Sequence, residues 1–110
     1  MPLLFSYGTL RDPNVQQINF GRLLAGRDDR ILGFRLEQVE ITDPHVLAVS
    51  GRTHHPILIA TGHPGDEVAG AVLELTDDEL RAADDYEVDD YRRVEAPLAS
   101  GGTAWVYAAR

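Results

Sequence analysis

Two short stretches near opposite ends of the sequence contain the residues best suited to chemistry. One is the turn at residues 7–10 (YGTL), where a glycine interrupts an apolar run. Successive backbone N–H groups of such a turn can point into a pocket and bind a carboxylate or an oxyanion. The other is Glu87, which ends the segment DDYE. A carboxylate held at the edge of a core has a raised pKa, which suits a general base.

The helix predicted before Glu87 is the reason to single out this glutamate. At about 100° per residue, Leu80, Ala83 and Glu87 share one narrow stripe, and Asp84 lies about 40° to one side. The stripe that should face the core therefore ends in a carboxylate, and the neighbouring aspartate should raise its pKa further. A glutamate at a helix end can equally bend outward or pair with an arginine of the next strand. From the helical-wheel positions alone, a glutamate that bends outward or pairs with an arginine is favoured over a catalytic one. Gly8, taken alone, can likewise simply end a strand.

The remaining sequence predicts the elements that must position these two stretches. Alternating or continuous apolar runs predict strands over residues 3–7, 32–41, 45–49, 56–60, 68–75, 91–98 and 103–108, with a change of face inside the second. Helices are predicted over 14–24, with an interruption at Gly21, and over 77–86. Many short strands with one or two helices indicate a single α+β domain over residues 1–110. We expect a small curled mixed β-sheet or barrel.

Local signals mark where the two predicted helices begin. Asp12 followed by Pro13 is an N-cap with proline at the first helical position, and Gly26 is a plausible stop for this helix. Thr76 and Glu79 have the spacing of a capping box.

Composition excludes several classes of function. The formal net charge is −8, and the sequence contains arginines but no lysine. A net negative charge of this size repels nucleic-acid phosphates and anionic membranes. With no cysteine there is neither a disulfide framework nor a thiolate metal site. The adjacent His54 and His55 would point to opposite faces of a strand, so no metal is expected. No apolar run approaches the ~20 residues of a membrane span, and MPLLF lacks the basic flank of a signal peptide. We therefore expect a cytoplasmic protein with a small-molecule ligand.

Taken together, the motifs resemble the γ-glutamylcyclotransferase, AIG2-like family. The family's early Y-G-[ST]-L turn is matched by YGTL, and its G-x-[VL] strand with an L-D-x-[YF]-E-G helix end is matched by GAVLELTDDELRAADDYEV. YRRVEAPL and AWVY correspond to its Y-x-R and V-Y strands. The order and spacing agree over nearly the whole chain, and the region from about 25 to 64 matches only loosely.

The resemblance implies roles for six residues. Glu87 matches the catalytic glutamate, which acts as a general base. The substrate-binding residues are expected at the matching turn and at the tyrosine of the closing strand: Tyr7, Gly8, Thr9, Leu10 and Tyr107. Two positions depart from the family pattern, because Val88 replaces the usual glycine and Ala83 the usual leucine.

The resemblance also implies a reaction that needs no cofactor. The α-amine of a γ-glutamyl compound attacks its own side-chain amide, which forms 5-oxoproline and releases an amine or amino acid. The alternative is a non-catalytic domain of the same fold that binds a small metabolite. A protein-interaction domain that uses the acidic helix surface is a third possibility, but it would not require an inward-facing acid. The leaving group, the pathway and the oligomeric state are left open by the sequence.

Overall fold

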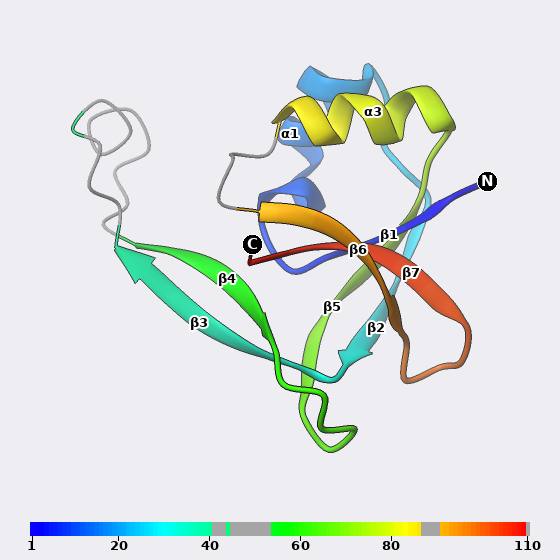
Figure 1. Cartoon of the computed structure of the whole chain (residues 1–110). Coiled ribbons are helices and arrows are strands. Elements are labelled where there is room, and N and C mark those ends of the chain that lie inside the picture. The colour runs from blue at the N-terminus through cyan, green and yellow to red at the C-terminus, as the bar shows by residue number, and fades with distance from the viewer. Residues whose placement is uncertain (41–43, 45–53, 87–90, 110) are drawn as a thin grey trace.

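The computed structural model describes residues 1–40, 44, 54–86 and 91–109. Within them, five strands form one mixed sheet in the order β2-β5-β1-β7-β6, and β3 pairs with β4 in a second sheet that extends from the main body (Figure 1). Only the β1–β7 pairing in the larger sheet is parallel. The elements are β1 (Leu3–Ser6), η1 (Thr9–Arg11), α1 (Pro13–Phe20), β2 (Gly26–Leu32), β3 (Phe34–Glu40), β4 (His54–Ala60), β5 (Glu67–Glu74), α3 (Asp77–Tyr86), β6 (Tyr91–Pro97) and β7 (Thr103–Ala109).

The larger sheet curls until its two edges approach each other. Ile31 of β2 forms an isolated bridge with Leu98, which follows β6, and the N–H of Ala99 donates to the carbonyl of Arg30 at 2.9 Å. No continuous ladder joins these edges in the described chain, so the sheet stops short of a closed barrel. The predicted α+β fold with a curled mixed sheet is confirmed.

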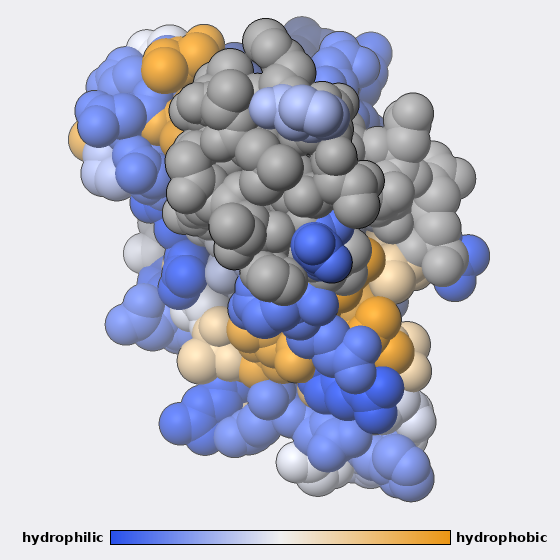
Figure 2. All heavy atoms as spheres, turned by 90° about the vertical axis from the view of Figure 1, so that its left-hand side faces the viewer, coloured by the Kyte–Doolittle hydropathy of each residue, from blue (hydrophilic) through white to orange (hydrophobic). Residues whose placement is uncertain are grey.

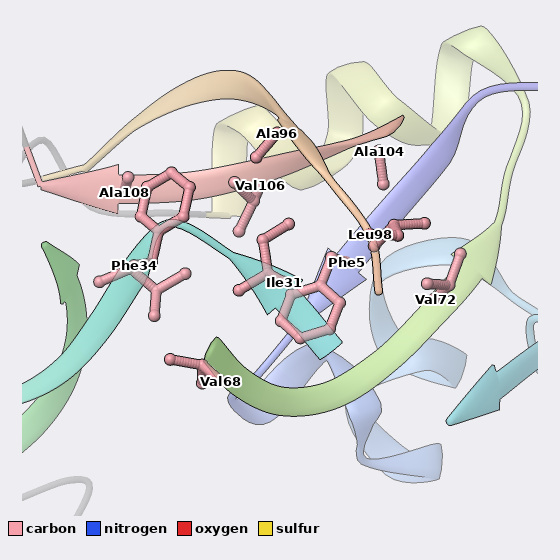
Figure 3. Packing of buried hydrophobic residues seen from close by; sticks show 11 residues of the cluster. Phe5, Ile31, Phe34, Val68, Val72, Ala96, Leu98, Ala104, Val106 and Ala108 are labelled. Atoms are coloured by element: carbon pink, nitrogen blue, oxygen red, sulfur yellow. The ribbon is translucent and has the colours of Figure 1, made fainter. Parts of the chain in front are cut away.

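Two hydrophobic clusters lie on opposite faces of this sheet. Leu4 and Phe5, adjacent on β1, belong to different clusters, as the two-residue period of a strand requires. Phe5 lies inside the curl with Ile31, Val106 and other apolar residues (Figure 3). The helix-side cluster consists of Leu4, Leu10, Leu75, Leu80, Ala83 and Tyr107. The alternation along β1 therefore places the loop that follows it at the junction of both clusters.

Helix α1 begins as predicted but ends earlier. The carboxylate of Asp12 accepts the N–H of Asn14 at 2.7 Å, and Pro13 is the first helical residue. Gly21 adopts a left-handed conformation (φ 69°), and its N–H bonds the carbonyl of Gln17. The predicted extension to residue 24 with a stop at Gly26 is wrong, because Gly21 supplies the left-handed C-cap that closes the helix.

The strand predicted over residues 32–41 corresponds mainly to β3, since Leu32 is the last residue of β2 and residue 41 lies outside the described residues. Gly33, with φ 83°, turns the chain between β2 and β3. Strand β2 went unpredicted because its sequence, GRDDRIL, is mostly polar, as an exposed edge strand allows. The strand predicted over 45–49 lies outside the described residues.

Helix α3 follows the prediction at both ends. The N–H of Thr76 donates to Glu79 at 2.8 Å, and the N–H of Glu79 donates back to the Thr76 hydroxyl at 3.1 Å, which completes the capping box. Leu80 and Ala83 are buried, so these two residues of the predicted stripe face the core. In the part of the chain that is described, α3 and the other helices are all too short or too polar to cross a bilayer.

Candidate active site

Three side chains fix the loop that follows β1: Tyr7 and Gln16 bond it to other elements, and Arg11 bonds within it. The Tyr7 hydroxyl donates to the main-chain carbonyl of Tyr107 at 2.6 Å. The guanidinium of Arg11 reaches back to the carbonyls of Tyr7 and Gly8, at 3.2 and 3.4 Å. The buried Gln16 donates to the carbonyl of Leu10 at 2.9 Å and accepts the N–H of Leu24 at the same distance. The loop is thus held in place without lying in a regular strand.

These bonds orient the peptide groups of the loop. A trans peptide is planar, so the N–H of one residue points opposite to the carbonyl of the residue before it. Because the carbonyls of Tyr7 and Gly8 point towards Arg11, the N–H groups of Gly8 and Thr9 point away from that guanidinium. Two neighbouring donors on one side of a turn are the arrangement that binds an anionic oxygen.

Gly8 has no conformational reason to be glycine. Its φ lies outside the left-handed region, and a Cβ there would meet no atom of the described residues within 4 Å. The free space beside the main chain is what a glycine provides when a ligand must approach the backbone closely.

The C-terminal turn of α3 is bonded to β6 and β7 through Asp84. Arg93 donates from Nε to Oδ1 of Asp84 at 2.8 Å and from Nη2 to Oδ2 at 3.1 Å. The Tyr107 hydroxyl donates to the same Oδ1 at 2.7 Å. The Arg93 guanidinium also lies 4.5 Å from the ring centroid of Trp105, at cation–π distance. The Asp84 carboxylate therefore connects α3 to both β6 and β7.

This ion pair changes the expected electrostatics at the end of α3. The negative charge of Asp84 is balanced by Arg93, so a nearby carboxyl group meets a neutral pair rather than an isolated like charge. The charge of Asp84 is therefore offset by a cation, and two donor atoms of Arg93 are committed to this carboxylate.

The structure brings five of the six predicted site residues together. Tyr7, Gly8, Thr9 and Leu10 form the loop and η1, and Tyr107 on β7 contacts that loop through its carbonyl. Leu10 and Tyr107 are buried. Glu87 lies outside the described residues, as does Val88.

Sequence reasoning missed the residues that hold this arrangement, namely Asp84 as a hydrogen-bond partner, Arg93, Trp105 and Gln16. A signal existed for Arg93: strand periodicity puts it on the same face of β6 as Tyr91, and it lies opposite Tyr107 in the β6–β7 register. No local signal identifies Gln16, whose bonds depend on the folded loop.

Two hollows lie elsewhere on the described surface. One of ≈ 320 Å³ lies on the α1 side of the loop, lined by Arg11, Gln16 and Leu24 and floored by Ala71 and Leu73 of β5. The other, ≈ 530 Å³, lies between β3 and β5. On the face shown in Figure 2, a group of hydrophobic atoms is bordered by hydrophilic ones. Only the first hollow adjoins the loop.

Comparisons with known proteins agree with the resemblance seen in the sequence. The family model for gamma-glutamyl cyclotransferase, AIG2-like proteins matches residues 4–110. A protein of Arabidopsis thaliana known from a solution structure superposes with a TM-score of 0.76 at 19% identity, over 98% of this chain and 61% of its own. A gamma-glutamyl cyclotransferase gives 0.69 at 19% identity, over 99% and 66%. An uncharacterized protein of Pyrococcus horikoshii gives 0.62 at 18% identity, over 99% and 78%.

The solved structures establish the shared fold, and the family model establishes membership. This chain spans 61% to 68% of the length of the first three structures it matches. No curated protein sequence matches it significantly. Because the family model covers residues 4–110, the chain belongs to the gamma-glutamyl cyclotransferase, AIG2-like family.

Proposed function

We propose that this protein cyclises a γ-glutamyl compound to 5-oxoproline and releases an amine or amino acid. The observation that carries the proposal is the contact between the Tyr7 hydroxyl and Tyr107, which joins the first and the last of the segments that resemble the family, 100 residues apart in sequence. Support also comes from the paired N–H groups of Gly8 and Thr9, which share one side of the loop.

The proposed reaction is an internal aminolysis. The α-amino nitrogen of the substrate forms a bond to the side-chain amide carbon, and the bond from that carbon to the leaving nitrogen breaks. The pKa of an α-amine is ordinarily about 8, so at neutral pH the amine must lose a proton before it attacks. We assign this proton transfer to Glu87, which then returns the proton to the departing nitrogen. The second proton that the attacking nitrogen loses as the lactam forms passes to solvent.

The loop has the second role in the proposal. As the tetrahedral intermediate forms, negative charge develops on the former carbonyl oxygen, and the N–H groups of Gly8 and Thr9 would stabilise it. Removal of one such donor typically raises the activation barrier by about 3 kcal/mol. Folding the substrate towards its five-membered ring would add an orientation effect.

The test is turnover by the purified protein. Glutathione, γ-glutamyl amino acids and γ-glutamylamines are incubated with the wild type, Glu87→Gln and Glu74→Gln, and 5-oxoproline is measured. Glu74 is an exposed glutamate at the end of β5 and serves as the matched control. We expect turnover by the wild type and the control but not by Glu87→Gln. Turnover that survives Glu87→Gln would refute the assignment of the base. Calorimetric binding of these compounds without turnover would show instead that the protein is a non-catalytic binding domain.

A further inference from the structure

We propose that Asp84, Arg93 and Tyr107 form a positioning clamp that fixes the last turn of α3 relative to the loop of residues 7–10. The inference deepens the proposed function, since it assigns positioning roles to residues of the same site. It has a separate structural readout, because the position of the turn can be measured without turnover.

The first part of the clamp is the carboxylate of Asp84. It accepts three hydrogen bonds, two from the planar fork of Arg93 and one from the Tyr107 hydroxyl, all between 2.7 and 3.1 Å. Bidentate Arg–carboxylate pairs fix orientation as well as distance. Trp105 supports the guanidinium from its face, which limits the rotation of Arg93. The last turn of α3 is therefore held in one orientation above β6 and β7.

The second part is the double use of Tyr107. Its side chain bonds α3, while its main-chain carbonyl accepts the Tyr7 hydroxyl at 2.6 Å. Tyr107 itself is buried in β7 and is only 6% exposed. One rigid residue thus links the helix end to the loop. Glu87, the proposed base, directly follows Tyr86, the last residue of this helix.

The helix dipole indicates that Asp84 does not serve to stabilise α3 by itself. A carboxylate in the last turn opposes the helix dipole and is unfavourable there. The last turn of α3 contains no basic residue to offset this cost. Arg93 supplies the compensating charge from a different element, which ties the position of α3 to that of β6.

The same helix offers a matched control. Arg22 donates to Glu79 in the first turn of α3 with the same bidentate geometry, at 2.8 and 2.7 Å. Removing either arginine breaks one bidentate pair on one helix. Only the Arg93 pair lies at the end that leads to the proposed base.

The experiment compares Arg93→Gln and Arg93→Lys with Arg22→Gln. Amide hydrogen exchange of α3 is measured by NMR, and kcat and KM are measured for the best substrate. For Arg93→Gln we expect the rate of amide exchange over residues 83–86 to rise about tenfold or more, because the helix end loses hydrogen bonds to a charged group. We expect kcat to fall by a similar factor and KM to change less than about threefold. Arg93→Lys, which keeps the charge without the fork, should lie between wild type and Arg93→Gln. Arg22→Gln should leave residues 83–86 and kcat within about threefold of wild type.

Equal effects of Arg93→Gln and Arg22→Gln on exchange over residues 83–86 would overturn the clamp. So would a loss of activity in Arg93→Gln that appears in KM alone. If the wild type turns over no compound, the proposed function fails, and the exchange comparison still decides the clamp. If Arg93→Gln does not fold, the same measurements on Arg93→Lys decide it.

Discussion

Substitution of Gly70 by alanine tests the close packing of β1 on β5 directly beneath the loop. A Cβ at this position would lie 2.4 Å from the carbonyl oxygen of Ser6 and 2.7 Å from the ring of Phe5. Real Cβ contacts are essentially never shorter than 3.0 Å, so a backbone atom would have to move by 0.6 Å or more. Phe5 is only 1% exposed and is enclosed by the core, so it has little room to yield.

Two opposing effects set the size of the change. Alanine reduces the entropy of the unfolded chain, which alone would stabilise the protein by about 0.4–1 kcal/mol. Overpacking a dense core typically costs about 1–3 kcal/mol, and a clash with main chain lies at the upper end of this range. We therefore expect a net loss of roughly 2 kcal/mol in the free energy of unfolding. For a chain of this size, that loss lowers Tm by roughly 9 °C.

The assay is thermal unfolding followed by circular dichroism, with Gly65→Ala as the control. Gly65 is exposed in a turn, has no positive φ, and a Cβ there would meet no described atom within 4 Å. The control should change the unfolding free energy by less than about 0.5 kcal/mol, or stabilise slightly. A Gly70→Ala protein as stable as Gly65→Ala would refute the close approach of β1 to β5.

Three further outcomes are expected. Gly8→Ala should leave Tm nearly unchanged but reduce turnover by about tenfold or more, because its Cβ fills space open to a ligand; unchanged kinetics would contradict this. The hydrogen bond from Arg22 lowers the pKa of Glu79 from 4.5 to about 2, so the stability that Glu79 contributes is complete above pH 4.5 and is lost as the pH falls towards 2. Tm measured against pH should therefore fall less steeply in this window for Glu79→Gln than for wild type, and parallel curves would argue against it. Gln16→Leu leaves two main-chain partners unsatisfied, and urea unfolding should show a loss of about 1–3 kcal/mol, whereas a neutral result would contradict the buried bonds.

Elements with strong local signals were predictable from the sequence. The capping box of Thr76 and Glu79, and the apolar stripe of Leu80 and Ala83, determine α3 through neighbours within one or two turns. Strand β5 and the β6–β7 hairpin were identified in the same way. The YGTL turn was visible because a glycine interrupts an apolar strand.

Elements that depend on distant partners were not predictable. Polar β2 is a strand because its main chain pairs with β5 and not because of its own residues. Gly21 ends α1 through a left-handed cap that the sequence alone did not distinguish from a later stop at Gly26. For α1 the two candidate stops were of similar strength and the folded backbone decided between them, whereas β2 has no apolar pattern that could predict it.

The sequence by itself determined which residues are chemically capable, since residue types and local periodicity are properties of neighbouring positions. Only the tertiary structure decided which of them meet. Tyr7 reaches Tyr107 because β1 lies parallel to β7, and Asp84 reaches Arg93 because α3 packs on that side of the sheet. The order of strands in a sheet is set by burial of the whole core, and no local pattern encodes it.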